Sequence, residues 1–203
     1  MFGTDFLAYM DPRPNSPWTA YLLDQFDQIL EKTAFDGIHL DQYGDPKVGY
    51  DAQGKSYPLD AALAQLIDAA HERVAALRPG GAVVFSTVTN WPIQTVSPSA
   101  QDIVYIEVRP PYTFYTDLEQ LVHQGQALGK GKPVVLAAYI DPVLEHTVRL
   151  MDAVIFASGG GHIELGEKDG LRPMHISRGT GPCRRRWPPS CAAITISPCA
   201  TKT

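Results

Sequence analysis

The sequence predicts an α/β fold, specifically an incomplete (β/α)8 barrel of the TIM type, on three observations. Strand-like and helix-like segments alternate through most of the chain, and the strand-like segments are apolar enough to be buried on both faces. The third observation is length, because a closed barrel takes about 250 residues and this chain has 203. We therefore expect about the last five to six strands of such a barrel.

The expected elements follow from the spacing of apolar residues and from turn residues. Residues 6–10 form a possible first strand, and apolar residues recur at helical spacing in 17–33. A strand at 37–43 precedes a long polar loop at 44–58, which is a candidate functional loop. Further helices are expected at 59–79, at 116–129 with Thr116 as N-cap, and from Pro142, and further strands at 82–90, 102–110, 133–141 and 152–161.

Charge and cysteine content separate a body from a tail. Residues 1–167 hold 10 Lys and Arg against 21 Asp and Glu, whereas residues 168–203 hold 7 against 1. All three cysteines lie in the tail, eight residues apart, which fits no usual zinc spacing. We therefore expect a partial barrel domain at 1–169, an irregular tail at 170–203 that is disordered or frameshifted, and no metal or other cofactor.

The charge and the lengths of the apolar runs also exclude two classes of partner. The acidic body lacks the basic residues that neutralise phosphates, so no nucleic-acid partner is expected. No apolar run approaches the roughly 18 residues of a membrane span, and the N-terminus carries acids where a signal peptide would be basic. We expect no membrane partner and no signal peptide in this chain.

Asp41 and Glu107 occupy matching positions, each at the C-terminal end of an apolar strand, in "GIHLDQ" and "IVYIEV". In a parallel barrel these ends form the active-site face. Two carboxylates that converge there can divide the roles of acid and nucleophile, as in glycoside hydrolysis. For either residue alone, a strand-end cap or a salt-bridge partner is the alternative. Asp36 and Asp45 are expected to be turn and loop acids.

Around these two residues the sequence resembles glycoside hydrolase family 66, the endo-dextranases and cycloisomaltooligosaccharide glucanotransferases. "FDGIHLDQYGD" is similar to the nucleophile motif of that family and "VYIEV" to its acid/base motif, in the same order and 66 residues apart. The resemblance extends to "SPWTAYLLDQ", "TVTNWP" and "GGGHIELGE" and covers about residues 5–169.

The resemblance implies a retaining hydrolase that cleaves internal α-1,6-glucosidic bonds of dextran or isomaltooligosaccharides, in an extracellular or cell-surface protein. Asp41 would be the nucleophile, and Glu107 the general acid and then base, with a raised pKa. Retention requires the two carboxyl groups to lie about 5–5.5 Å apart. Cyclising transfer is the alternative; in this family it is associated with additional sugar-binding modules, and none is visible here.

Residues beside the two carboxylates are candidates for sugar contact. Asn90 can both donate to and accept from a hydroxyl, or it turns the chain ahead of Pro92. Four aromatic residues could stack on glucose rings or belong to the core, namely Trp91, Tyr43, Trp18 and Tyr112. Tyr139 shares its strand end with Asp141. His162 and Glu164 would line the far side of the cleft or stabilise their loop, and His39 is expected to be an interior histidine.

Two further functions stay open. The Gly-rich stretch "ASGGGHIELGE" could expose backbone N–H groups to a phosphate, which would indicate a barrel enzyme acting on a phosphorylated substrate. Alternatively the chain is an inactive, truncated fragment that at most binds glucan, because members of the resembled family carry earlier barrel strands and flanking β domains. Missing strands would leave an apolar sheet edge unpaired.

Overall fold

The computed structural model describes residues 10–41, 44, 47–51, 53–140, 144–163, 166–167 and 170–171. Residues 6–9 of the possible first strand and nearly all of the expected tail lie outside these residues. None of the helices in the described part of the chain combines the length and apolar character needed to cross a membrane.

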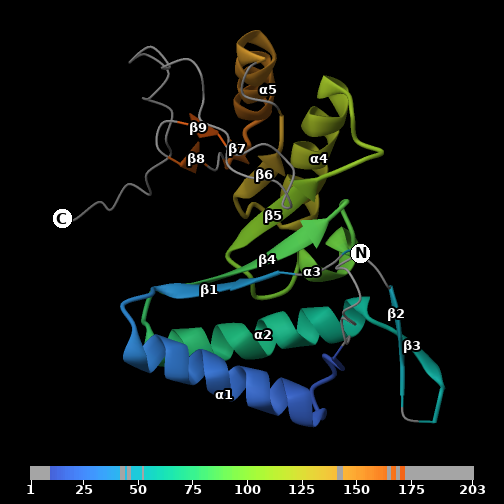
Figure 1. Cartoon of the computed structure of the whole chain (residues 1–203), viewed down its shortest axis with the longest axis vertical. Coiled ribbons are helices and arrows are strands. Elements are labelled where there is room, and N and C mark those ends of the chain that lie inside the picture. The colour runs from blue at the N-terminus through green and yellow to red at the C-terminus, as the bar shows by residue number, and fades with distance from the viewer. Residues whose placement is uncertain are drawn as a thin grey trace.

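The centre of the fold is a five-stranded parallel sheet in which consecutive strands lie side by side (Figure 1). Its order is β1 (Gly37–Leu40), β4 (Ala82–Val88), β5 (Ile103–Val108), β6 (Val134–Ala138) and β7 (Gly161–His162). Two short antiparallel pairs accompany it, β2 (Val48–Tyr50) with β3 (Ser56–Pro58), and β8 (Gly166–Glu167) with β9 (Gly170–Leu171).

Helices connect the parallel strands. Helix α1 (Pro17–Lys32) and helix α2 (Asp60–Leu77) lie side by side against β1 and β4, while α4 (Tyr115–Leu128) and α5 (Glu145–Ala157) lie beside β5 and β6 (Figure 1). The crossover from β4 to β5 contains only the one-turn helix α3 (Ile93–Val96). This agrees with the absence of a helical period between residues 91 and 101.

All four long helices cover the same face of the sheet. Leu40, Phe85, Val104 and Val134 are successive register partners across four strands, so their side chains share one face. The first two pack in a cluster with α1 and α2, and the last two in a cluster with α4 and α5. The described strands therefore confirm an α/β fold with a parallel sheet. They form an open sheet, so closure into a barrel stays a prediction.

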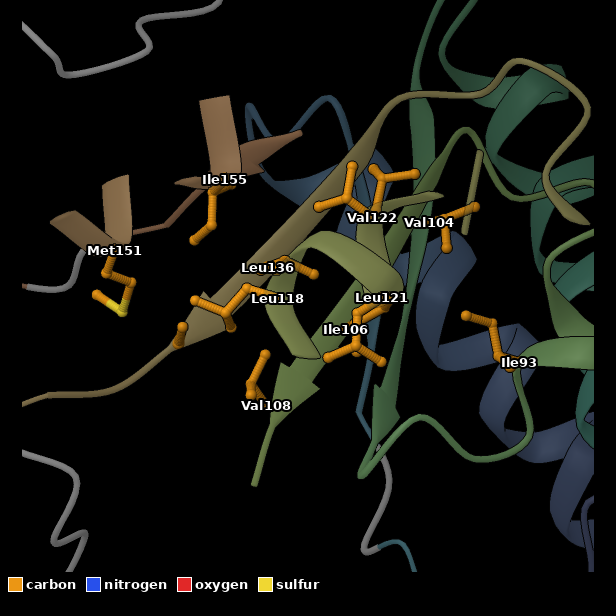
Figure 2. Packing of buried hydrophobic residues seen from close by; sticks show 12 residues of the cluster. Ile93, Val104, Ile106, Val108, Leu118, Leu121, Val122, Leu136, Met151 and Ile155 are labelled. Carbon is orange, nitrogen blue, oxygen red and sulfur yellow. The ribbon is translucent and has the colours of Figure 1, made fainter. Parts of the chain in front are cut away.

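The cluster under β5 and β6 fixes the strands that carry the candidate site. Figure 2 shows Ile106 and Leu136 on these strands, facing residues of α4 and α5. Both side chains are fully buried. Ile106 immediately precedes Glu107, and it is the register partner of Leu136. The position of Glu107 therefore depends on this packing.

Two predicted elements were wrong. Residues 152–157 of the expected strand at 152–161 are the end of helix α5, because Val148, Met151 and Ile155 recur at helical spacing and are buried. The expected N-cap Thr116 lies inside α4; the carboxylate that accepts the free N–H groups at the start of α4 is Asp117.

The predicted functional loop contains the hairpin β2–β3, which is attached to the segment before α1. Tyr57 packs closely over Gly49, and the guanidinium carbon of Arg13 lies 3.9 Å from the centroid of the Tyr57 ring. Arg13 also forms an ion pair of 2.7 Å with Asp11. The hydrogen bond from Arg13 is the main reason why the pKa of Asp11 falls from 3.8 to about 2.

This ion pair predicts an acid-dependent loss of stability. Because the folded pKa of Asp11 lies below its unfolded value, the stabilisation is complete above about pH 4 and is lost as the pH falls through about 2. Asp11→Asn should therefore reduce the fall in unfolding free energy measured between pH 5 and pH 2. Asp24→Asn, a matched change at a carboxylate bound by two glutamines, should retain the wild-type pH dependence. Identical pH curves for wild type and Asp11→Asn would contradict the assignment.

Candidate functional site

Asp41 and Glu107 lie on the same face and at the same edge of the sheet. Asp41 directly follows Leu40, and Leu40 is the register partner of Phe85 on β4. Asp41 is therefore level with the next residue of β4, Ser86, and with the register partner of Ser86 on β5, Tyr105. Glu107 is two residues further along on that face. In a flat sheet, two strand spacings of about 4.8 Å and two residues of about 3.3 Å place the Cα atoms on the order of 12 Å apart. Sheet curvature and the two side chains can shorten this separation.

Glu107 is held by groups from its own strand end and from β6. Its side chain is 12% exposed and accepts a hydrogen bond from Nη2 of Arg109, which completes an ion pair. Tyr139 lies two residues after Ala137, the register partner of Glu107, so it reaches the same face. The guanidinium carbon of Arg109 is 6.0 Å from the centroid of the Tyr139 ring.

Two tyrosines connect Glu107 with the strand that carries Asp41. Burial is the main cause that raises the pKa of Tyr139, and the Glu107 charge adds to it. Burial also raises the pKa of Tyr105, with smaller contributions from Tyr139, Glu107 and Asp41. The two carboxylates and the two phenols therefore share one electrostatic environment.

A tight turn after β4 separates the two carboxylates. Thr89 and Asn90 both have left-handed backbone, with φ of 54° and 60°, and the N–H of Trp91 donates to the carbonyl of Val88 over 3.1 Å. Such backbone is strained for residues other than glycine and is common at functional sites. The N–H of Thr89 donates to the backbone carbonyl of Glu107 over 3.1 Å, so the turn also anchors the end of β5.

The side chain of Asn90 is directed toward α4. Its amide nitrogen donates to Oε1 of Gln124 over 2.8 Å and lies 3.5 Å from the hydroxyl of Tyr112. This geometry, together with the positive φ, favours the alternative that Asn90 turns the chain ahead of Pro92. Contact of Asn90 with a sugar stays a prediction.

The loop after β1 packs against the same turn. A Cβ at Gly44 would lie 3.1 Å from Cγ1 of Val88, so glycine permits the close approach, and its φ of +80° also favours glycine. The ammonium of Lys47 lies 5.9 Å from the centroid of the Trp91 ring. Trp91 is half-buried, and its ring lies beside Lys47 of the predicted functional loop.

The other aromatic candidates differ in position. Trp18 is half-buried in the first turn of α1 and packs on the cluster beneath β1 and β4, which is the core role foreseen as its alternative. Tyr112 is half-buried against the cluster beneath β5 and β6. Tyr43, Asp141 and Glu164 lie outside the described residues.

His162 lies on the helix side of the sheet. Its register partner is Leu136, and its side chain is 3% exposed. Its ring nitrogens lie 2.7 Å from Oδ1 of Asp152 on α5 and 3.0 Å from the carbonyl of Ala138. These contacts favour stabilisation of the loop over contact with a sugar.

The Gly-rich stretch does not offer its first amides to a phosphate. The N–H groups of Ser158, Gly159 and Gly160 donate to carbonyls of α5. They also follow the C-terminal end of a helix, where the helix dipole disfavours an anion. The geometry therefore argues against the phosphate-binding alternative.

His39 is a correction. It points to the face opposite Leu40, as expected, but it is exposed rather than interior. Its ring packs edge-on against Tyr105 with centroids 5.0 Å apart. The exposure follows from its position on β1, the outer strand of the described sheet.

Sequence reasoning did not identify Tyr105 and Arg109 as site residues. Both lie two residues from Glu107, on either side of it, so strand alternation alone predicts that they share its face. The position of Tyr139 against Glu107 needed the pairing of β5 with β6, which local spacing does not reveal.

The fold and site are those of a parallel α/β sheet with one carboxylate at the C-terminal end of each of two strands. Such a pair can act through acid, base and nucleophile steps without a metal. In the described part of the chain, no group of three or more His, Cys, Asp or Glu residues could hold a metal ion.

Comparison with known proteins gives the family. The model of glycosyl hydrolase family 66 matches residues 2–174. A cycloisomaltooligosaccharide glucanotransferase of Niallia circulans is 32% identical over 145 residues, which are 68% of this chain and 15% of the relative. A second one from the same organism is 28% identical over 180 residues, or 78% of this chain and 19% of the relative.

A solved structure of the same kind of enzyme also matches this chain. The crystal structure of a Paenibacillus sp. cycloisomaltooligosaccharide glucanotransferase with cycloisomaltoheptaose has a TM-score of 0.61 and 26% identity, and the match covers 65% of this chain and 20% of that one. The chain belongs to glycosyl hydrolase family 66, a family of glycoside-processing enzymes. It spans about a fifth or less of the length of these relatives.

Proposed function

We propose that this chain is the acid-and-nucleophile part of a retaining enzyme that acts on α-1,6-linked glucans of the dextran type. The observation that carries the proposal is that Asp41, directly after β1, and Glu107, near the end of β5, lie at one edge and on one face of the sheet. Membership of family 66 supports glucan chemistry. The relatives named for cycloisomaltooligosaccharides support a substrate with isomaltose-type linkages.

In the proposed reaction, the Asp41 carboxylate attacks the anomeric carbon while the glycosidic C–O bond breaks and Glu107 protonates the leaving oxygen. An acceptor hydroxyl then attacks the glycosyl-enzyme, Glu107 takes its proton, and the Asp41 carboxylate is released. Two displacements at one carbon retain the configuration. Because the substrate is a polymer, we place the intact enzyme outside the cell or at its surface.

The acceptor decides between two functions. Water gives hydrolysis, the function expected from the sequence, whereas a hydroxyl of the same glucan gives a cyclic product. The names of both curated relatives and of the solved structure favour cyclising transfer as the second candidate.

Product analysis tests the proposal and separates the two candidates. The purified chain is incubated with dextran, and its products are separated and weighed by mass spectrometry. Hydrolysis should release linear isomaltooligosaccharides with reducing ends, while transfer should give products lighter by one water and without reducing ends. Release from starch but not from dextran would contradict the α-1,6 linkage, and no release from either would favour the inactive fragment.

A further inference from the structure

Two side chains near Glu107, those of Arg109 and Tyr139, are placed to fix the orientation of its carboxylate. Glu107 carries an ion pair to Arg109 on its own strand end, and Arg109 in turn lies over the ring of Tyr139 from the next strand. Arg109 thus connects the Glu107 carboxylate, which is only 12% exposed, with the ring of Tyr139 at the next strand end. A buried carboxylate requires such partners.

Charge proximity and ring packing extend this arrangement across the sheet. Burial raises the pKa of both Tyr139 and Tyr105, and the nearby Glu107 charge adds to the rise of each pKa. Tyr105 is 8% exposed and contacts His39 on β1 edge-on. The chain of contacts therefore runs from the end of β6 to the strand that precedes Asp41.

We infer that Tyr139 and Arg109 are positioning residues for Glu107, which hold its carboxylate in one orientation at the C-terminal edge of the sheet. This inference rests on the proposed function, in which Glu107 is the acid and the base. It also assigns Tyr139 a role different from the sugar contact expected from the sequence.

The positioning role has a chemical consequence. One fixed orientation keeps the Glu107 carboxyl directed at the leaving oxygen in the first displacement and at the acceptor hydroxyl in the second. The titratable and charged groups that face this network are His39 and Asp41 from β1 and its end, Tyr105, Glu107 and Arg109 from β5 and its end, and Tyr139.

Kinetics separate positioning from sugar binding. Tyr139→Phe removes only the hydroxyl, and with it the hydrogen bond to Glu107 that the inference assigns, so kcat should fall about tenfold to a hundredfold with little change in KM. A sugar contact would instead raise KM with kcat retained. Tyr21→Phe, the same change on the exposed side of α1, should behave as wild type. Arg109→Lys should retain more of kcat than Arg109→Met, because the charge is kept.

An NMR experiment tests the contact between Tyr139 and Glu107 without measuring activity. The chain has nine tyrosines, and ζ-13C labelling gives each phenol an NMR signal, which Tyr139→Phe assigns by deletion. Glu107→Gln should shift the Tyr139 signal and leave that of Tyr21 unchanged.

An unmoved Tyr139 signal, or an active Tyr139→Phe variant with wild-type kcat, would overturn the inference. A shifted signal in a chain that releases no product would support the contact and overturn the proposed function instead.

Discussion

Glu107→Gln should lower kcat on dextran by about 10²–10⁴-fold, the usual contribution of a general acid or base. The amide keeps the size of the side chain, its place at the end of β5 and its burial, but it cannot give or take the proton. Asp41→Asn should be at least as severe, because the glycosyl-enzyme can no longer form. Product release from dextran, followed over time, measures both variants.

A matched control lies at the opposite end of β1. Asp36 is exposed and precedes the strand, so Asp36→Asn makes the same chemical change as Asp41→Asn away from the candidate site. It should retain the wild-type rate. Equal rates for wild type, Asp41→Asn and Glu107→Gln would contradict the catalytic assignment of both carboxylates.

Leu136→Ala should lower the free energy of unfolding by about 3 kcal/mol, because it removes a large apolar side chain and leaves a cavity. Leu136 is fully buried in the cluster between the sheet and helices α4 and α5 (Figure 2). Its register partner Ile106 precedes Glu107, so the substitution should also reduce activity at temperatures where the variant is still folded. Chemical denaturation measures the first effect.

The control uses the same substitution on the same side of the fold. Leu150 on α5 is 49% exposed, so Leu150→Ala should change the free energy of unfolding by no more than about 0.5 kcal/mol. Equal losses in the two variants would mean that the cluster around Leu136 does not carry the stability assigned to it.

Elements with a sustained apolar period could be predicted from the sequence. Helices α1 and α2 bury residues at helical spacing, and strands β4, β5 and β6 consist mostly of apolar residues. Val154, Ile155 and Phe156 are typical of strands, so the sequence predicts a strand where α5 ends. Only the packing of Met151 and Ile155 on the core shows the helical period. The strand that follows, β7, has two residues and no apolar signal.

The candidate site could be predicted only in part for a similar reason. Asp41 and Glu107 stand out because each ends an apolar strand, which is a local feature. The contact of Tyr139 with Glu107 depends on the register of β5 with β6, and the burial of His162 depends on the register of β6 with β7. These strands are separated by helices α4 and α5, so their register depends on how the helices pack and cannot be read from spacing within one strand.

The central claim is that Asp41 is the nucleophile and Glu107 the acid and base, and rescue by azide tests it most directly. The substrate is an α-isomaltosyl fluoride, whose leaving group needs no protonation. In Glu107→Ala, azide should restore turnover and give the α-glycosyl azide, because the intermediate on Asp41 still forms and is displaced a second time. In Asp41→Ala, azide should take the place of the missing carboxylate and give the β-glycosyl azide. A β-glycosyl azide from Glu107→Ala and an α-glycosyl azide from Asp41→Ala would contradict the account.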